Sequence, residues 1–499
     1  MASWLLDLVQ YRGLLLMIIV LGIGGSFQYG FQISVLNSPS PFIKAFINDT
    51  WLHRYSLTIE NNELRILWSF IVSSYCIGGI LGSVGSGYLM SKCGKKRSLI
   101  YNDLIPIATA LLLGCSKMAK SFEMILIGRL LYGINAGIGF NIHSQYAGEI
   151  AHKKLRGFTN TSISIFVTTG KLLGQIMGLS EILGTEPQWP LLLSLSGVWA
   201  LVQLVSLPLF PESPVYLLME KNDKEGCLKA LKQLWGDRDH ETEIKEMMKE
   251  QAARKSDQSL SVKGLLHDRS LRWQIYMLLT MTTALQLCGV NAIYFYAAVV
   301  FEAAGLDFSQ IPYLTVGVGV CESFSVILCS LLMDRFGRKV LLLGGYTSMV
   351  LSLGLLTMTL SLQEKYTWMP YCSVMLIFLY VLSFGTGPGA ATITIIVELF
   401  PQEARAAAFV IVGLINWMGL FVIGMVFPLV EETLGPFCFL LFIAIITGCA
   451  VFLYHYLPET KGKSALEIKA DFNKYNFRRQ HQQQTSICSP KVIVMSTKL

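Results

Sequence analysis

The chain has 499 residues, of which 53% are hydrophobic and 15% are charged, with a formal net charge of +7. Soluble proteins carry about a quarter charged residues. The low charged fraction therefore excludes a set of ordinary soluble domains and predicts a chain embedded in lipid. The eleven cysteines include no CxxC pair, so their spacing predicts neither a metal site nor a disulfide framework.

A membrane-spanning helix requires about 20 mainly apolar residues, and twelve such runs follow one another along the chain. They cover 12–36, 66–90, 99–116, 123–143, 158–180 and 189–210, then 273–301, 310–333, 340–361, 369–397, 405–430 and 436–457. The pattern predicts an all-α membrane protein. Its parts are an N-terminal six-helix bundle (1–210), a cytoplasmic helical linker (211–272), a C-terminal six-helix bundle (273–457) and a cytoplasmic tail (458–499), which we expect to be disordered from about Phe472.

Three short motifs occur once in each predicted bundle. They are Leu89–Lys96 with Leu332–Lys339, the pair Glu149 and Arg156 with the pair Glu398 and Arg405, and Pro211–Ser213 with Pro458–Thr460. Their order and nearly constant offset indicate two parallel six-helix repeats. Such repeats support alternating access, in which the two bundles rock about a substrate site near the middle of the membrane.

Lys and Arg are concentrated in alternate short loops, around Lys95–Arg97, Lys153–Arg156 and Arg335–Lys339. By the positive-inside rule these loops, the linker and both termini are cytoplasmic. The loop between the first two spans is then external. It contains the sequon Asn48-Asp49-Thr50, which predicts a glycan on Asn48 of a plasma-membrane protein.

Charged residues near the cytoplasmic ends of the spans are candidates for an inner gate. Opposite charges there can pair across helices, close the inner face, and separate as the bundles rock. For any single residue the alternative is ordinary positive-inside charge. The candidates are Arg97, Arg129, Glu149, Arg156, Asp334, Arg335, Arg338, Glu398 and Arg405.

Together these motifs resemble the facilitative glucose/fructose transporter family of the major facilitator superfamily, over nearly the whole chain. The similarity is strongest to its class II, fructose-handling branch. The matching stretches are GRLLYGINAG (128–137), EIAHKKLRG (149–157), FPESP (210–214), LQLCGVNAIYFYA (285–297), DRFGRK (334–339), GPG (387–389), VELFPQEAR (397–405) and NW (416–417). The resemblance implies the twelve-helix major facilitator fold and facilitated diffusion of a hexose.

The resemblance also implies a sugar site on several of the predicted spans. The positions that match the family's sugar-binding or cavity-lining residues are Gln28, Tyr29, Ser164, Gln286, Asn291, Asn416 and Trp417. The chain departs from the family at Leu285, Ser164 and Ile393, where glutamines and a tryptophan are expected, and at Cys288, where a serine is expected. These changes remove groups that glucose would use, so fructose, glucose or both stay open as cargo.

Two charges lie mid-way along predicted spans, Lys171 in 158–180 and Glu322 in 310–333. A charge at the centre of the bilayer costs at least about 2.5–3.5 kcal/mol. Lys171 lies two turns after Ser164 and shares its helix face. By resemblance the two runs face each other across the bundles, so we expect Lys171 and Glu322 to pair and to contact the substrate. The alternatives are local hydrogen bonding and a zwitterionic or heterocyclic cargo.

Coupling to protons would require an acid on the first span, where Gln32 stands at the position of the acid in proton-coupled relatives. We therefore expect uniport, with a proton-coupled symporter through Glu322 as the alternative. No GxxxxGK[ST] motif and no nucleophile–base–acid set is found, so neither ATP drive nor an enzyme is expected. A transporter-like sensor remains possible. The expected partners are a sugar and the lipid bilayer, with no cofactor, metal or nucleic acid, and the chain is expected to act as a monomer.

Overall fold

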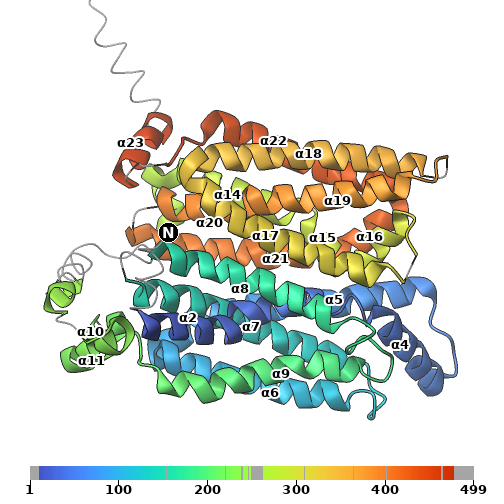
Figure 1. Cartoon of the computed structure of the whole chain (residues 1–499), viewed down its shortest axis with the longest axis horizontal. Coiled ribbons are helices and arrows are strands. Elements are labelled where there is room, and N and C mark those ends of the chain that lie inside the picture. Colours follow the sequence, from blue (N-terminus) through green and yellow to red (C-terminus); the bar gives the residue numbers. More distant parts are fainter. Residues whose placement is uncertain are drawn as a thin grey trace, which may run out of the picture.

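The structure is a computed structural model of the whole chain. It describes residues 11–152, 156–219, 221–237, 240–245, 247–248, 262–307, 309–363, 365–400, 402–461, 463 and 465–476. Long helices run side by side through the molecule, and the two halves of the sequence lie next to each other (Figure 1).

The first half consists of helices that pack mainly on one another, α5 on α7, α3 on α8 and α6 on α9. They are α2 (Arg12–Gly24), α3 (Ser26–Ser34), α5 (Asn61–Cys93), α6 (Lys95–Cys115), α7 (Glu123–Ile150), α8 (Arg156–Met177) and α9 (Trp189–Ser206). The expected external loop after the first span contains a further helix, α4 (Ser40–Tyr55).

The second half repeats this arrangement, with α17 on α19, α14 on α21 and α18 on α22. Its helices are α14 (Arg272–Gln286), α15 (Val290–Phe295), α16 (Ala297–Ala303), α17 (Ile311–Phe336), α18 (Arg338–Leu362), α19 (Met369–Thr386), α20 (Pro388–Leu399), α21 (Gln402–Leu434) and α22 (Cys438–Tyr456).

These helices make up twelve spans. Ten stretches of described residues are long and apolar enough to cross a membrane, and one of them, Ala407–Tyr456, contains both α21 and α22. Counting these two separately and adding α8, which contains Lys171, gives twelve. The predicted twelve-helix major facilitator fold is confirmed.

Three spans are broken in their interior. The first is interrupted at Gly25 between α2 and α3, the seventh around Gly289 between α14 and α15, and the tenth at Gly387 between α19 and α20. Gly289 has φ of +99°, which favours glycine because it has no Cβ. Breaks free backbone groups for other partners, and the Tyr380 hydroxyl donates to the Cys288 carbonyl at 2.5 Å. Discontinuous helices are the usual place for substrate sites in transporters.

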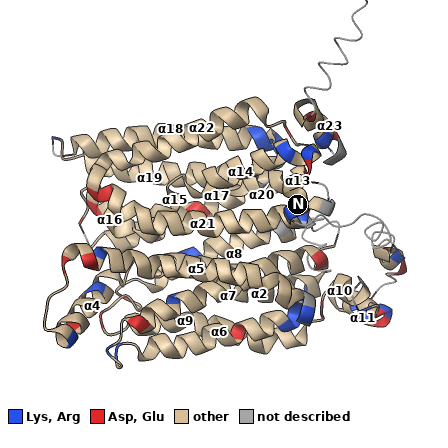
Figure 2. Cartoon of the chain, turned by 180° about the vertical axis from the view of Figure 1, so that it is seen from behind, with Lys and Arg blue, Asp and Glu red and all other residues tan. Residues whose placement is uncertain are grey.

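The halves meet along two pairs of helices, α5 with α21 and α8 with α17, and Figure 1 shows α8 and α17 next to each other in the middle of the molecule. One end of the molecule, which we call the basic end, carries α10 (Pro214–Met219), α11 (Lys224–Trp235), α13 (Val262–His267) and α23 (Ala465–Asn476). Figure 2 shows Lys and Arg gathered there, while few charges lie along the long helices.

The linker and the tail supply the short helices at the basic end. In α11 the carboxylate of Asp223 caps the helix by accepting from Gly226 N at 2.8 Å, and the apolar face of α11 packs on α2.

The tail departs from expectation, because α23 extends to Asn476 and Phe472 is fully buried. Phe472 was expected to begin a disordered segment. Its burial against the second half outweighs the polar composition around it, and the residues from 477 lie outside the described part.

Close backbone approach between α5 and α7 depends on glycine. A Cβ on Gly78 would lie 2.0 Å from the Leu130 carbonyl oxygen, and one on Gly133 would lie 2.0 Å from the Tyr75 carbonyl oxygen. Both clashes are with helix backbone, which cannot move without separating the two helices. Small residues at such contacts are typical of helix packing in membranes.

We predict that Gly78→Ala lowers the thermal unfolding temperature, because overpacking a tight contact costs about 1–3 kcal/mol. Gly85→Ala is the matched control on the same helix, since a Cβ there meets nothing within 4 Å. Intrinsic tryptophan fluorescence of the purified protein during heating measures both. Equal unfolding temperatures for the two variants would contradict the packing argument.

Candidate functional site

A chain of side-chain hydrogen bonds crosses the interface between the halves at mid-depth. Asn291 Nδ2 donates to Gln286 Oε1 at 3.0 Å, and Gln286 Nε2 donates to Asn416 Oδ1 at 2.8 Å. Asn416 Nδ2 then donates to the hydroxyl of Tyr29 at 3.3 Å. Gln286 and Asn291 lie on either side of the break at Gly289, and Gln286 links Asn291 to α21. The structure thus brings together four residues that the sequence placed in the sugar site.

Trp417 is buried beside this chain. Its ring lies edge-on to Tyr29 and Tyr75, with ring centroids 5.3 and 5.4 Å apart, respectively. A Cβ on Gly79 would lie 2.1 Å from the Trp417 ring, so α5 approaches the indole closely at this glycine. These aromatic contacts enclose the hydrogen-bonded chain on one side. They also join the two halves, since Trp417 belongs to the second half and Tyr29 and Tyr75 to the first.

Lys171 and Glu322 form an ion pair between α8 and α17. Lys171 Nζ lies 2.9 Å from Glu322 Oε1 and 3.2 Å from Oε2, and the side chains are only 7% and 4% exposed. The hydroxyl of Tyr294 donates to Glu322 Oε2, and Lys171 Nζ lies 4.1 Å from the centre of the Tyr294 ring. The pair therefore joins the halves, with one aromatic ring contacting both charges.

Other buried amides lie close to these residues in sequence. Gln28, next to Tyr29, and Gln175, one turn after Lys171, are buried, and neither amide has a hydrogen-bond partner among the described residues. Gln175 contacts α17 at Gly319. A buried amide without a partner costs about 1–3 kcal/mol, so both are suited to a ligand with hydroxyl groups. Ser164 is half-buried on α8.

The motif residues at the basic end form one arrangement twice. In the first half Lys95 pairs with Glu149 at 2.7 Å, and in the second half Arg338 pairs with Glu398 at 3.1 Å. These two described pairs each join helices of the same half, whereas the gate hypothesis needs charges that meet between halves. Among the other candidates, Arg97 and Arg335 are exposed, Arg405 Nη2 donates to the Phe400 carbonyl at 3.3 Å, and the side chains of Arg156 and Asp334 lie outside the described part.

Two further carboxylates, which were not among the gate candidates, complete this repeat. Glu212 accepts from the backbone N–H of Lys96 at 3.0 Å, and Glu459 accepts from those of Arg338 and Lys339 at 3.0 and 3.1 Å. Both acids belong to the repeated Pro-Glu-Ser/Thr motif. The repeat of that motif was the signal that could have identified them.

Arg129 does not belong to the inner gate. It lies on α7 twenty residues before Glu149, a separation of about 30 Å along a helix. Arg129 Nη1 donates to the carbonyl and the side-chain oxygen of Gln32 at 2.9 and 3.0 Å, and its guanidinium lies 4.6 Å from the centre of the Tyr75 ring. Its place in a shared motif suggested the gate, but helix direction puts it in the other half of the membrane.

At the end opposite the basic end, side chains close the interface between the halves. Arg65 on α5 pairs with Glu432 on α21, and the hydroxyl of Tyr313 on α17 donates to Glu181, which follows α8. The hydrogen bond from Tyr313 lowers the pKa of Glu181 below its ordinary value. Asn48 is exposed on α4, which lies at this same end in Figure 1.

Comparisons with known proteins agree with this architecture. A family profile described as "Sugar (and other) transporter" matches residues 17–472. Solved structures of the proton:xylose symporter XylE share the fold. One bound to 6-bromo-6-deoxy-D-glucose has a TM-score of 0.73 at 21% identity, covering 93% of this chain and 99% of that one. Another, the inward open conformation from E. coli, has a TM-score of 0.72 at 20% identity, covering 92% and 99%.

Sequence relatives are more similar still. Human solute carrier family 2, facilitated glucose transporter member 11, is 40% identical over 96% of both chains. Mouse member 5 is 40% identical over 92% of this chain and 91% of its own, and mouse member 9 is 40% identical over 91% and 84%.

The fold and the buried polar site are those of a membrane transporter rather than an enzyme. The chain belongs to the sugar transporter family of the major facilitator superfamily, and its relatives are facilitated glucose transporters of solute carrier family 2. The resemblance that the motifs indicated is confirmed.

We predict that Lys171→Ile lowers stability strongly, because removing one partner of a buried ion pair costs about 3–5 kcal/mol. The double variant Lys171→Ile/Glu322→Asn leaves no stranded charge and should regain most of the lost stability. Thermal unfolding of the wild type, both single variants and the double variant gives the coupling energy. Additive effects of the two substitutions would show that the ion pair contributes nothing.

Proposed function

We propose that the chain is a uniporter that carries a hexose, fructose or glucose, down its gradient by alternating access. The observation that carries the proposal is the hydrogen-bonded chain of Asn291, Gln286, Asn416 and Tyr29 at the junction of the halves. Sugar hydroxyls both donate and accept hydrogen bonds, and neutral amides and a phenol offer both functions in a site shielded from water. Each of these bonds can be exchanged for a bond to a hydroxyl without leaving a charge unpaired.

The alternating movement is supported by where the interactions lie. Two ion pairs join the halves: Lys171–Glu322 at mid-depth and Arg65–Glu432 at the end opposite the basic end. Together they hold the end opposite the basic end closed. We propose that the six-helix units 1–210 and 273–457 rock against each other as rigid bodies, connected by 211–272. These contacts break when the end opposite the basic end opens. Charge pairs within each half, such as Lys95–Glu149, can stay intact throughout.

Uniport rather than proton coupling is supported by Gln32. Its amide donates to the Ser196 hydroxyl at 2.6 Å and accepts from Arg129 at 3.0 Å. A side-chain amide does not titrate, so this position on the first span cannot exchange a proton with substrate binding. Glu322 is held by Lys171 and Tyr294. Its carboxylate is therefore engaged at the interface between the halves in this conformation.

A second candidate cargo is favoured by the ion pair itself. Lys171 and Glu322 offer a positive and a negative group a few ångströms apart, which matches a zwitterionic solute better than a neutral sugar. We propose that the pair contacts the substrate in either case. The competition experiment below separates the two candidates.

The distribution of Lys and Arg indicates how the protein is oriented in the membrane. We propose that the basic end faces the cytoplasm at the plasma membrane, since Lys and Arg favour that side. This orientation places the exposed Asn48 outside, where its sequon can receive a glycan, and both termini inside. We propose the monomer as the functional unit, because one chain contains both halves of the site.

We predict that the purified protein in proteoliposomes takes up radiolabelled fructose or glucose, and that unlabelled hexose competes while zwitterionic amino acids do not. Because Gln32 cannot titrate, collapsing the proton gradient with a protonophore should leave the initial rate unchanged. Protein-free liposomes are the control. If uptake stops when the proton gradient is collapsed, the protein is a symporter. If zwitterionic amino acids compete and unlabelled hexose does not, the cargo is a zwitterionic solute rather than a hexose.

We predict that Asn416→Ala lowers hexose uptake at least about tenfold, since it removes two hydrogen-bonding functions of a buried polar site, each contributing about 1 kcal/mol or more. Asn62→Ala is the matched control, because Asn62 is an exposed amide at the start of α5. Uptake at several sugar concentrations measures both variants. Equal uptake by Asn416→Ala and wild type would remove this residue from the site.

A further inference from the structure

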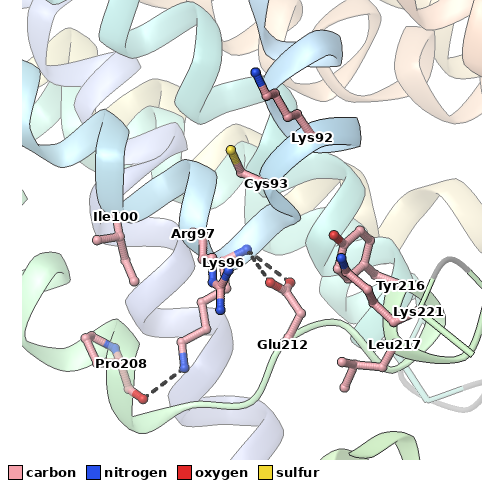
Figure 3. Close-up of a pocket in the computed structure, with 10 residues that line it drawn as sticks. All are labelled: Lys92, Cys93, Lys96, Arg97, Ile100, Pro208, Glu212, Tyr216, Leu217 and Lys221. Carbon is pink, nitrogen blue, oxygen red and sulfur yellow. Dashed lines mark hydrogen bonds between the residues drawn. The ribbon is translucent and has the colours of Figure 1, made fainter. Parts of the chain in front are cut away.

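A cavity of about 490 Å³ lies at the basic end of the first half, far from the polar chain between the halves (Figure 3). It is bounded by the end of α5, the start of α6, the segment that follows α9, and α10. The side chains that matter for its chemistry are Lys92, Cys93, Lys96, Arg97, Glu212 and Lys221.

The cavity is strongly basic. Four of its lining residues carry a positive charge and one carries a negative charge, which leaves a formal surplus of three. The negative group is already engaged, because Glu212 accepts from the backbone N–H groups of Lys96 and Ser213. Figure 3 shows Glu212 held against the start of α6 in this way. The surplus is therefore not cancelled inside the cavity.

The positive groups differ in their exposure and in their hydrogen bonds. Lys96 Nζ donates to the carbonyls of Pro208 and Phe210 at 2.9 and 2.6 Å and fixes the cavity floor. The side chains of Lys92, Arg97 and Lys221 are exposed, and Lys92 Nζ donates to the hydroxyl of Tyr88 on the same helix at 3.2 Å. The three residues come from the end of α5, the start of α6 and the segment after α10.

The repeat alone does not produce this lining. In the second half Lys339 and Glu459 reproduce the contacts of Lys96 and Glu212, and Lys339 Nζ donates to the Tyr454 carbonyl at 2.9 Å. However, Phe336 and Val340 stand at the positions of Cys93 and Arg97, 243 residues later. Both are exposed apolar side chains. The framework of the motif thus occurs twice, whereas Cys93 and Arg97 are particular to the first half.

The cavity continues into an apolar surface. Arg97, Tyr101 and Leu104 follow at spacings of four and three, so they share one face of α6. Tyr101 and Leu104 are 54% and 53% exposed, and Val205 on the neighbouring α9 is 67% exposed. In a membrane protein such a face contacts lipid tails. A basic pocket and an apolar wall are therefore joined at the level where lipid headgroups meet acyl chains.

We propose that this cavity binds the phosphate-bearing headgroup of an anionic phospholipid. Lys92, Arg97 and Lys221 contact the headgroup, and an acyl chain follows the face of α6 through Tyr101 and Leu104. Basic pockets beside transmembrane helices recognise anionic headgroups by this combination. A soluble phosphate would use the same cations but would gain nothing from the apolar wall, which favours the lipid.

Native mass spectrometry of the full-length protein tests the site, with phosphatidylserine and phosphatidylcholine of identical acyl chains titrated separately. Wild type should retain phosphatidylserine preferentially, and Arg97→Gln/Lys221→Gln should lower its occupancy at least about fivefold, given the attraction of each cation for anionic lipid. Lys365→Gln, which removes an exposed charge elsewhere, should keep wild-type occupancy. Equal binding of the two lipids, or unchanged binding in the double variant, would overturn the proposal.

Cys93 gives a second readout that needs no substitution in the pocket. Phosphatidylserine should slow alkylation of Cys93 by N-ethylmaleimide, measured by peptide mapping, and phosphatidylcholine should not. Cys115, the exposed residue that ends α6, serves as the internal control and should react at the same rate throughout. Protection of Cys93 by inorganic phosphate to the same degree would overturn the lipid assignment and leave a soluble anion as the ligand.

Discussion

The cost of an unpaired polar group in hydrocarbon constrains this whole structure. Lys171 meets Glu322 and Arg129 meets the Gln32 carbonyl, whereas the buried carboxylate of Asp103 on α6 has no hydrogen-bond partner among the described residues. A broken span needs the same compensation, which the Tyr380 hydroxyl supplies at the seventh span. Because water cannot satisfy these groups inside the bilayer, the helices must stay in the register that brings donors and acceptors together. Polar residues in the spans therefore specify which helices meet.

That constraint also separates interactions that can break from those that persist. Hydrogen bonds and ion pairs that join the halves, through Asn416 and Tyr29 or through Lys171 and Glu322, are made in this conformation. The neutral bonds can be exchanged for bonds to hydroxyl groups without leaving a charge unpaired, whereas separating Lys171 from Glu322 leaves two charges that need other partners. The repeated contacts of Glu212 with the start of α6 and of Glu459 with the start of α18 each lie within one half. They hold the ends of each bundle together and do not cross between the halves.

Much of this architecture could be predicted from the sequence, because lipid forces a simple pattern on it. The twelve apolar runs, the repeated motifs and the polar positions of the candidate sugar site were all visible in it. Two expectations failed for reasons of packing. Phe472 lies in a polar segment, yet on α23 its side chain is buried against the second half. Arg129 was expected among the gate residues, yet it lies on α7 twenty residues before Glu149. A sequence motif identifies residues but does not give the depth at which each one lies in the membrane.

The sequence by itself determined the number of spans, their repeat and the family, since these depend on local hydropathy and on motifs read along the chain. Only the tertiary structure decided which polar groups meet. Lys171 and Glu322 are 151 residues apart, and Tyr29 and Asn416 are 387 residues apart. Contacts over such distances depend on how helices pack, and so does the basic cavity beside α6. Packing is set by the whole set of neighbours, which no single segment of sequence contains.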